Sequence, residues 1–121
     1  MSRFMLMLRA DENATHVAPP QELFDAIGRI AEEWTSSGVL LDTAGLAPTA
    51  ASTRVRLAAG QITTESGPFT DDKEAVTAYA LVQVDSPQDA IDRAIEFLSL
   101  HKQHWPGWEG SSEVRQTFGP E

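Results

Sequence analysis

The sequence predicts a single α+β domain in which two helices pack on one sheet, and three observations support this prediction. The chain has 121 residues, which is the size of one domain spanning residues 1–121. Two stretches repeat apolar residues at helical spacing. These stretches alternate with strand-like runs in the order strand, helix, strand, hairpin, strand, helix, strand. That order is typical of a ferredoxin-like βαββαβ sheet with an extra hairpin, whose helices cover one face.

The first strand and the first helix are predicted between residues 4 and 38. Phe4–Leu8 is a brief apolar run that ends at polar residues, as a strand does when it feeds a loop. Pro19-Pro20 suits the first turn of a helix. The apolar residues that then recur at helical spacing are Leu23, Phe24, Ile27, Ile30, Ala31 and Trp34. Gly38 stands where a left-handed helix cap is expected.

The middle of the chain predicts a second strand and a hairpin. Val39–Leu41 and Ala44–Leu46 together indicate an irregular strand. Thr53–Leu57 alternates polar and apolar residues, which is typical of a half-exposed strand. Ala59–Gln61 is expected to turn the chain tightly into Ile62–Thr64 and so to close a small hairpin.

The last third predicts a strand, the second helix and a final strand. Thr77–Val84 is the longest strand-like run. Ser86-Pro87 is a strong helix start, and Trp105-Pro106 ends the helix because proline disfavours helical geometry in the residue before it. The residues expected on the buried side of this helix are Ile91, Ala94, Ile95 and Leu98. Glu113–Phe118 alternates as a last strand.

The strands at Phe4–Leu8 and Thr77–Val84 carry apolar residues on both faces. Strands of this kind are usually buried on both faces, and two helices cover only one. We therefore expect a second copy of the chain to cover the other face in a two-fold homodimer. The alternative is that long loops of the same chain fold over the sheet.

Composition excludes several function classes. The net charge of −9 and the scattered basic residues argue against a nucleic-acid partner. No apolar stretch approaches the length of a membrane span, and no cysteine is present for disulfides or thiolate chemistry. We expect a cytoplasmic protein with no membrane partner and no organic cofactor.

The order and spacing of short motifs resemble the YCII-related family, in its branch marked by an Asp-Gly-Pro-Phe (DGPF) turn. The matching pieces are Phe4–Met7, Gly38–Leu41 with Gly45-Leu46, Arg54–Arg56, Gly67–Phe69 with Lys73-Glu74, and Glu113–Gln116. The resemblance spans nearly the whole chain and implies a ferredoxin-like fold assembled as a dimeric α/β barrel. It implies no agreed activity, although some members carry a transcription-initiation label through association with sigma factors.

The sequence departs from the family pattern at three positions. Ser66 replaces the usual aspartate that begins the turn. Ala44 stands where the family often has glutamate, and Ala47 where it has a polar residue or histidine. Any role of those side chains is absent here or has moved.

Two groups of residues are candidates for binding a ligand. Ser66, Gly67, Pro68 and Phe69 offer backbone N–H groups and a hydroxyl, although Gly and Pro are also what a tight turn needs, with Phe69 anchored in the core. The aromatic residues expected to line a pocket are Tyr79, Trp105 and Trp108, with Trp34 and Phe97 beside them. Trp34 has the helical spacing of a core residue.

Candidate catalytic residues come from the second helix and from the end of the first strand. His101 and His104 share a helix face and suit proton transfer near neutral pH. The non-functional alternative is that they place positive charge at a helix end, where it suits the helix dipole. A metal site completed by a nearby carboxylate is a third alternative. The other two are preferred to it, so we predict no metal. Asp11 and Glu12 are a carboxylate pair that serves as acid and base or simply solvates a loop, which also holds His16.

Two functions remain open from the sequence. The first is an enzyme in which a pocket between the sheet and the second helix holds a small substrate. His101 or His104 would move a proton there, helped by Asp11 or Glu12, in lyase or isomerase-type chemistry. The second is a non-catalytic dimeric module that binds a ligand or a protein such as a sigma factor, and the two alanine replacements favour it.

Overall fold

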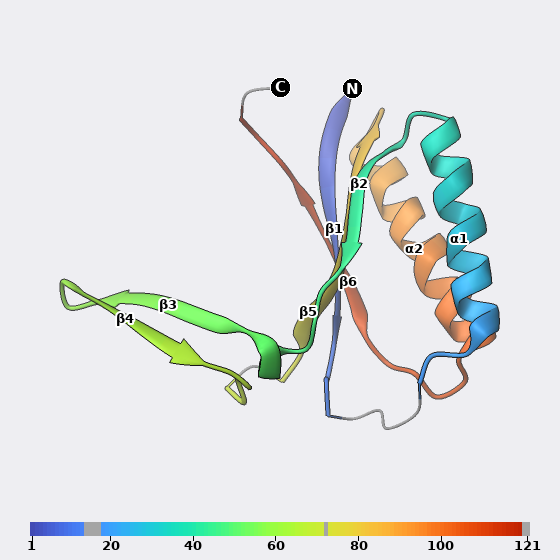
Figure 1. The fold of residues 1–121 in the computed structure, drawn as a ribbon. Helices are drawn as coiled ribbons and strands as arrows, with labels where there is room; N and C mark the ends of the chain where they lie inside the picture. The colour runs from blue at the N-terminus through green and yellow to red at the C-terminus, as the bar shows by residue number, and fades with distance from the viewer. Residues whose placement is uncertain (14–17, 72, 120–121) are drawn as a thin grey trace.

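The computed structural model describes residues 1–13, 18–71 and 73–119 (Figure 1). Its elements in chain order are β1 Ser2–Ala10, α1 Gln21–Ser36, β2 Leu40–Gly45, the short 3-10 helix η1 Thr49–Ala51, β3 Thr53–Ala58, β4 Gln61–Ser66, β5 Ala75–Val84, α2 Pro87–His104 and β6 Ser111–Gln116. His16 and Asp72 lie outside the described residues.

Four strands form one antiparallel sheet in the order β2-β5-β1-β6. Both helices lie against the same face of this sheet, as Figure 1 shows from the side. The α+β prediction with two helices on one face is therefore confirmed, and the strand order is compatible with a ferredoxin-like topology. Strands β3 and β4 pair only with each other and make the expected extra hairpin.

Local signals in the sequence set the helix ends. Gly38 follows α1 with a φ of +81°, the left-handed conformation that glycine adopts without steric cost. The Ser86 hydroxyl accepts a hydrogen bond from the Asp89 N–H at 3.1 Å and so caps the start of α2. Helix α2 ends at His104, one residue before the boundary that Pro106 imposes.

The buried side of α2 agrees with the prediction only in part. Ala94 is buried and Leu98 is half-buried, as predicted, and Ala90 and His101 are buried as well. Ile91 and Ile95, by contrast, are 40% and 58% exposed. Two neighbouring stripes of this helix both satisfy helical spacing, and the stripe with the smaller side chains faces the sheet. Small side chains let the helix axis approach the strands closely, because no branched group stands between them.

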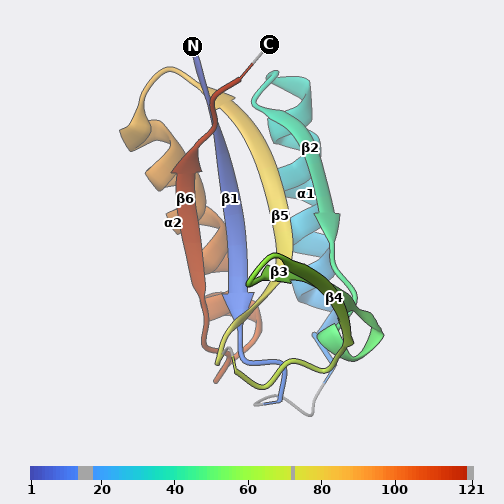
Figure 2. The ribbon, with the colours of Figure 1, turned by 90° about the vertical axis from the view of Figure 1, so that its left-hand side faces the viewer.

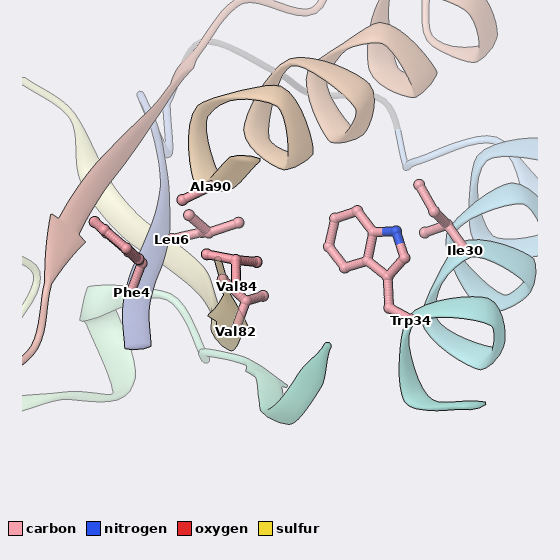
Figure 3. Packing of buried hydrophobic residues seen from close by; sticks show 7 residues of the cluster. All are labelled: Phe4, Leu6, Ile30, Trp34, Val82, Val84 and Ala90. Carbon is pink, nitrogen blue, oxygen red and sulfur yellow. The ribbon is translucent and has the colours of Figure 1, made fainter. Parts of the chain in front are cut away.

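The core lies between the helices and the two central strands. Its cluster of buried residues, drawn in Figure 3, is Phe4, Leu6, Ile30, Trp34, Val82, Val84 and Ala90. The pairing of β1 with β5 places Phe4 opposite Val82 and Leu6 opposite Ala80. Trp34 is only 3% exposed, as its spacing predicts, and its indole Nε1 donates to Glu96 at 3.2 Å.

The second face of the main sheet has an apolar centre, and we call it the open face. Side chains alternate along a strand, so Met5 and Met7 of β1 lie on this face opposite Leu81 and Tyr79 of β5. The polar side chains around them are Arg3, Gln83, Glu113 and Arg115. Figure 2 looks onto this face, and in the described part of the chain no helix or strand lies flat against it. The expected alternative of long loops folding over the sheet is not what the described residues do.

The β3–β4 hairpin projects from the lower end of the sheet on the side of the open face (Figures 1 and 2). The turn residues Ala59 and Gly60 have φ values of 51° and 76°, which suit a two-residue hairpin turn. The apolar side chains on one face of the hairpin are Val55, Leu57 and Ile62, which are 66%, 71% and 72% exposed. The prediction of a half-exposed strand is wrong for this reason: the hairpin stands away from the sheet, so neither of its faces is covered by the body of the chain.

Candidate functional site

An apolar cavity of about 90 Å³ lies between the two helices and the main sheet. Helix α1 supplies Ile30 and Trp34 to its wall, and α2 supplies Phe97. The floor is made by β1 and by Ala78 and Ala80 of β5. These two alanines are the signal that sequence reasoning missed, because short side chains facing bulky helix residues leave a void.

A stack of aromatic rings lies beside this cavity at the end of α2. The His101 ring centroid is 4.9 Å from that of Phe97 and 4.4 Å from that of Trp108. Trp105 lies 6.3 Å from Trp108. Phe97 belongs both to the cavity wall and to the stack, whereas Trp105 and Trp108 do not line the cavity. The structure therefore divides the predicted aromatic set into two groups that meet at Phe97.

The stack encloses His101 and changes its titration. The side chain is 4% exposed, and its Nδ1 lies 3.1 Å from the Phe97 carbonyl oxygen of the preceding helix turn. Burial lowers the pKa of the imidazole below 6.5, and the hydrogen bond to the carbonyl opposes that shift in part. His101 is thus held neutral inside the molecule.

The predicted pairing of histidines with carboxylates does not form within the described residues. Neither His101 nor His104 has a carboxylate partner there, and His104 is half-buried at the last position of α2. Asp11 accepts a hydrogen bond from the Asn13 N–H at 2.9 Å within its own turn. No cluster of three histidine, aspartate or glutamate side chains that would hold a metal ion occurs in the described ranges.

Glu12 ties the end of β1 to η1. One carboxylate oxygen accepts the Thr49 backbone N–H and the other accepts the Thr49 hydroxyl, each at 2.6 Å. The Thr49 hydroxyl oxygen in turn accepts the Phe69 N–H at 3.2 Å. Both oxygens of Glu12 are therefore engaged in holding the chain, and we call these three residues the Glu12–Thr49–Phe69 tether.

The Gly-Pro-Phe turn packs closely on η1. The Gly67 N–H donates to the Ser52 carbonyl at 2.9 Å. A Cβ at Gly67 would overlap the Thr49 carbonyl, so only glycine permits this approach. Ser66 is exposed at the end of β4, and the Gly67–Pro68 peptide bond is cis. The turn's backbone groups thus serve its packing against the neighbouring segment.

Phe69 lies outside the core, contrary to the prediction. Its ring is covered by the Arg54 guanidinium, whose Cζ stands 4.0 Å from the ring centroid. Arg54 also pairs with Asp71, with a shortest N–O distance of 3.0 Å. A hydrogen bond to its backbone and the bond from Arg54 lower the pKa of Asp71 below 3.8. Phe69 is thus half-buried beneath a charged side chain and is not part of the core cluster.

Tyr79 is among the residues that line the cavity, although its place opposite Met7 in the strand register puts its side chain on the open face. Its hydroxyl donates to the Asp42 carboxylate at 3.0 Å, and that bond, with the nearby negative charge, raises the pKa of Tyr79 above 10.0. Trp34 and Phe97 are the two members of the predicted aromatic set whose rings pack at the helix side of the cavity. The cavity itself lies under both helices, rather than under the second helix alone.

Comparison of the sequence with models of known protein families finds no match, and comparison with curated proteins finds no significant relative. The resemblance to the YCII-related family thus stays a prediction. No helix in the described part of the chain is both long enough and apolar enough to cross a membrane.

The tether predicts a stability effect at Thr49. The substitution Thr49→Val keeps the shape of the side chain but removes the hydroxyl that donates to Glu12 and accepts from Phe69. We expect a loss of about 1–3 kcal/mol in the free energy of unfolding, measured by urea denaturation. Thr35→Val is the matched control, because that hydroxyl is exposed and bonds only to the Ala31 carbonyl. Its effect should stay within about 0.5 kcal/mol. Equal losses in both variants would contradict the tether.

The burial of His101 predicts a pH dependence of stability. Because the folded pKa lies below the unfolded value of about 6.5, the unfolded chain takes up the proton first as the pH falls. The stabilisation is present above pH 6.5 and is lost as the pH falls through the folded pKa. Urea denaturation of the wild type and of His101→Gln, from pH 7.5 to pH 5, should show a steeper fall for the wild type. Parallel curves for the two proteins would mean that His101 does not titrate in this way.

Proposed function

We propose that the chain is a dimeric module that binds a small apolar molecule in the cavity between its helices and its sheet. The cavity is the observation that carries the proposal. Its walls at Ile30, Phe97 and Ala80 are apolar. A cavity lined mainly by such side chains takes up small apolar ligands, as known for an engineered apolar cavity of about 150 Å³ in another protein. Thr43 and Ser112 are polar members of the lining here. A cavity of about 90 Å³ fits a short hydrocarbon chain or the edge of a single ring.

The environment of the histidines favours binding over acid/base catalysis. A general base must come within hydrogen-bond reach of the proton it takes. The Nδ1 atom of His101 already lies at a helix carbonyl, and Phe97 stands between its ring and the cavity. Glu12 has both oxygens engaged by Thr49. The lyase or isomerase-type reading therefore has less support than the non-catalytic one.

Two apolar surfaces on one side of the molecule support the dimer. The first is the centre of the open face around Met5 and Leu81, and the second is the hairpin face with Leu57 and Ile62. An isolated two-stranded hairpin is at best marginally stable in water, so this arm needs cover. Because the hairpin projects on the side of the open face (Figure 1), one two-fold contact with a second copy covers both surfaces. A dimeric barrel is the assembly that would result.

The cavity predicts ligand stabilisation that a larger side chain abolishes. Xenon, dissolved under pressure to ten times its Kd, should raise the free energy of unfolding of the wild type by about 1.4 kcal/mol. Ala80→Leu fills the cavity from the sheet and Ala31→Leu fills it from α1, so neither variant should respond. Ala50→Leu, an exposed site on η1, is the control and should respond like the wild type.

The histidine variants separate the two readings of the cavity. Stabilisation by xenon that survives His101→Ala and His104→Ala supports the non-catalytic module. Its loss in both variants would mean that the imidazoles contribute to the site. A wild type that xenon does not stabilise at any pressure would show that the cavity is not a binding site.

The dimer predicts a mass of twice the 13.2 kDa of one chain in light scattering at micromolar concentration. Leu57→Lys places a charge in the apolar face of the hairpin, which is 71% exposed in the single chain, and should shift the protein to monomer. Ile95→Lys changes an apolar side chain on α2 that is 58% exposed and should leave the dimer intact. A wild type that elutes as a 13.2 kDa monomer would overturn the assembly and leave the hairpin as a surface for another protein.

A further inference from the structure

A second hollow, larger and more polar than the apolar cavity, lies where β1 ends and β5 begins. Its volume is about 400 Å³. Arg9 and Glu74 bring opposite charges to its wall, and Thr49 and Ser52 bring hydroxyl groups from η1 and its cap. Leu46 completes the wall, together with Ala47, Ala75 and Val76. We call it the Arg9–Glu74 hollow.

Arg9 is a half-buried cation without a carboxylate partner among the described residues. Its Nη2 donates to the backbone carbonyl of Glu74 at 3.2 Å, and no ion pair in the described ranges includes it. The chain has 18 acidic and 9 basic residues, so acids are abundant, yet none of those that the structure describes forms an ion pair with this guanidinium. The guanidinium of Arg9 is planar, and its remaining N–H groups have a fixed geometry that matches the two oxygens of a carboxylate.

Glu74 is the matching anion. Its Oε1 accepts a hydrogen bond from the Ser111 hydroxyl at 3.5 Å, the limit of such a contact, and no cation in the described part of the chain pairs with it. Arg9 and Glu74 thus line one hollow without forming an ion pair with each other. Each side chain is half-buried, where a charge interacts more strongly than in bulk water.

The neighbouring polar groups are mostly engaged. The Thr49 hydroxyl belongs to the Glu12–Thr49–Phe69 tether, and Ser52 donates weakly to the Pro48 carbonyl at 3.5 Å. The charges therefore dominate recognition, and Leu46 offers an apolar surface between them and the solvent. A dianion such as phosphate fits poorly, because a single arginine faces it while Glu74 repels it.

We propose that the Arg9–Glu74 hollow binds a small zwitterion, an amino acid in chemical class, with its carboxylate at Arg9 and its ammonium group at Glu74. The short apolar body of the ligand packs against Leu46 and Val76. Both ionic contacts are charge-assisted hydrogen bonds, which are the stronger kind. This site is separate from the apolar cavity, since no residue lines both.

Four related small molecules test the assignment. L-Norvaline and 5-aminopentanoate are isomers. L-Norvaline carries its ammonium and carboxylate groups close together, and 5-aminopentanoate carries them at opposite ends of the molecule. Pentanoate lacks the ammonium group of both isomers, and butylamine lacks the carboxylate of both. Isothermal calorimetry and amide chemical shifts should show that one isomer binds at least tenfold more tightly than pentanoate and butylamine. The shifted amides should belong to residues 46–52 and 74–76.

Charge-neutral variants assign the two ends. Arg9→Gln and Glu74→Gln should each weaken the favoured isomer roughly tenfold to hundredfold, the loss expected for one charge-assisted hydrogen bond. Arg9→Lys keeps the positive charge and should lose less affinity than Arg9→Gln. This difference would show that the effect of Arg9→Gln is due to the lost charge and not to misfolding. The matched controls are Arg56→Gln and Glu65→Gln, an arginine and a glutamate on the exposed hairpin. They should bind as the wild type does.

Three outcomes would overturn the proposal. The first is that neither isomer binds. The second is that pentanoate binds as tightly as the isomers in both the wild type and Glu74→Gln, which would make the hollow a plain anion site. The third is binding that Arg9→Gln and Glu74→Gln leave unchanged. Ala80→Leu, which fills the apolar cavity, should not alter the binding of the favoured isomer. Binding in the apolar cavity and binding in this hollow are therefore tested independently.

Discussion

The pairing register of β1 against β5 is the constraint on which the rest of the structure depends. It sets Phe4 opposite Val82 and Leu6 opposite Ala80, and so puts these side chains under the helices. Because side chains alternate along a strand, a slip by one residue would bring Met5 and its neighbours under the helices instead. The core, the cavity and the open face all follow from this one alignment.

The same register explains why the core contains a void. Helix α1 presents the bulky side chains of Ile30 and Trp34 to the core, whereas α2 presents Ala90. The strand beneath them offers Ala78 and Ala80, whose methyl groups leave space below the helix side chains. Close packing is thus incomplete between both helices and the sheet at these two alanines.

The elements with strong local signals were predictable from the sequence. The Ser86 cap, the boundary before Pro106 and the left-handed Gly38 each depend on chemistry within one turn of chain, and the structure has all three. Strand β6 runs from Ser111 to Gln116 rather than from Glu113 to Phe118, because its bounds depend on pairing with β1, which no local signal reveals.

The candidate site was harder to predict because its contacts join distant parts of the chain. Glu12 was expected to act with a histidine, but its partner is Thr49, 37 residues away. Phe69 was expected in the core, but it is half-buried under the Arg54 guanidinium. On α2 the prediction held for Ala94 and was wrong for Ile91 and Ile95, because more than one stripe of this helix satisfies the helical period. In each case the deciding interaction joins residues far apart in the sequence, so local sequence patterns do not reveal it.

The hairpin has a consequence for how this architecture diversifies. Strands β3 and β4 share no ladder with the main sheet, and their base is clamped by the Glu12–Thr49–Phe69 tether and the Gly67–Ser52 bond. A change in the length of this hairpin, or in its side chains, would leave the pairing of the four-stranded sheet intact. The hairpin can therefore change in length and sequence without disturbing the hydrogen-bonded ladders of the main sheet.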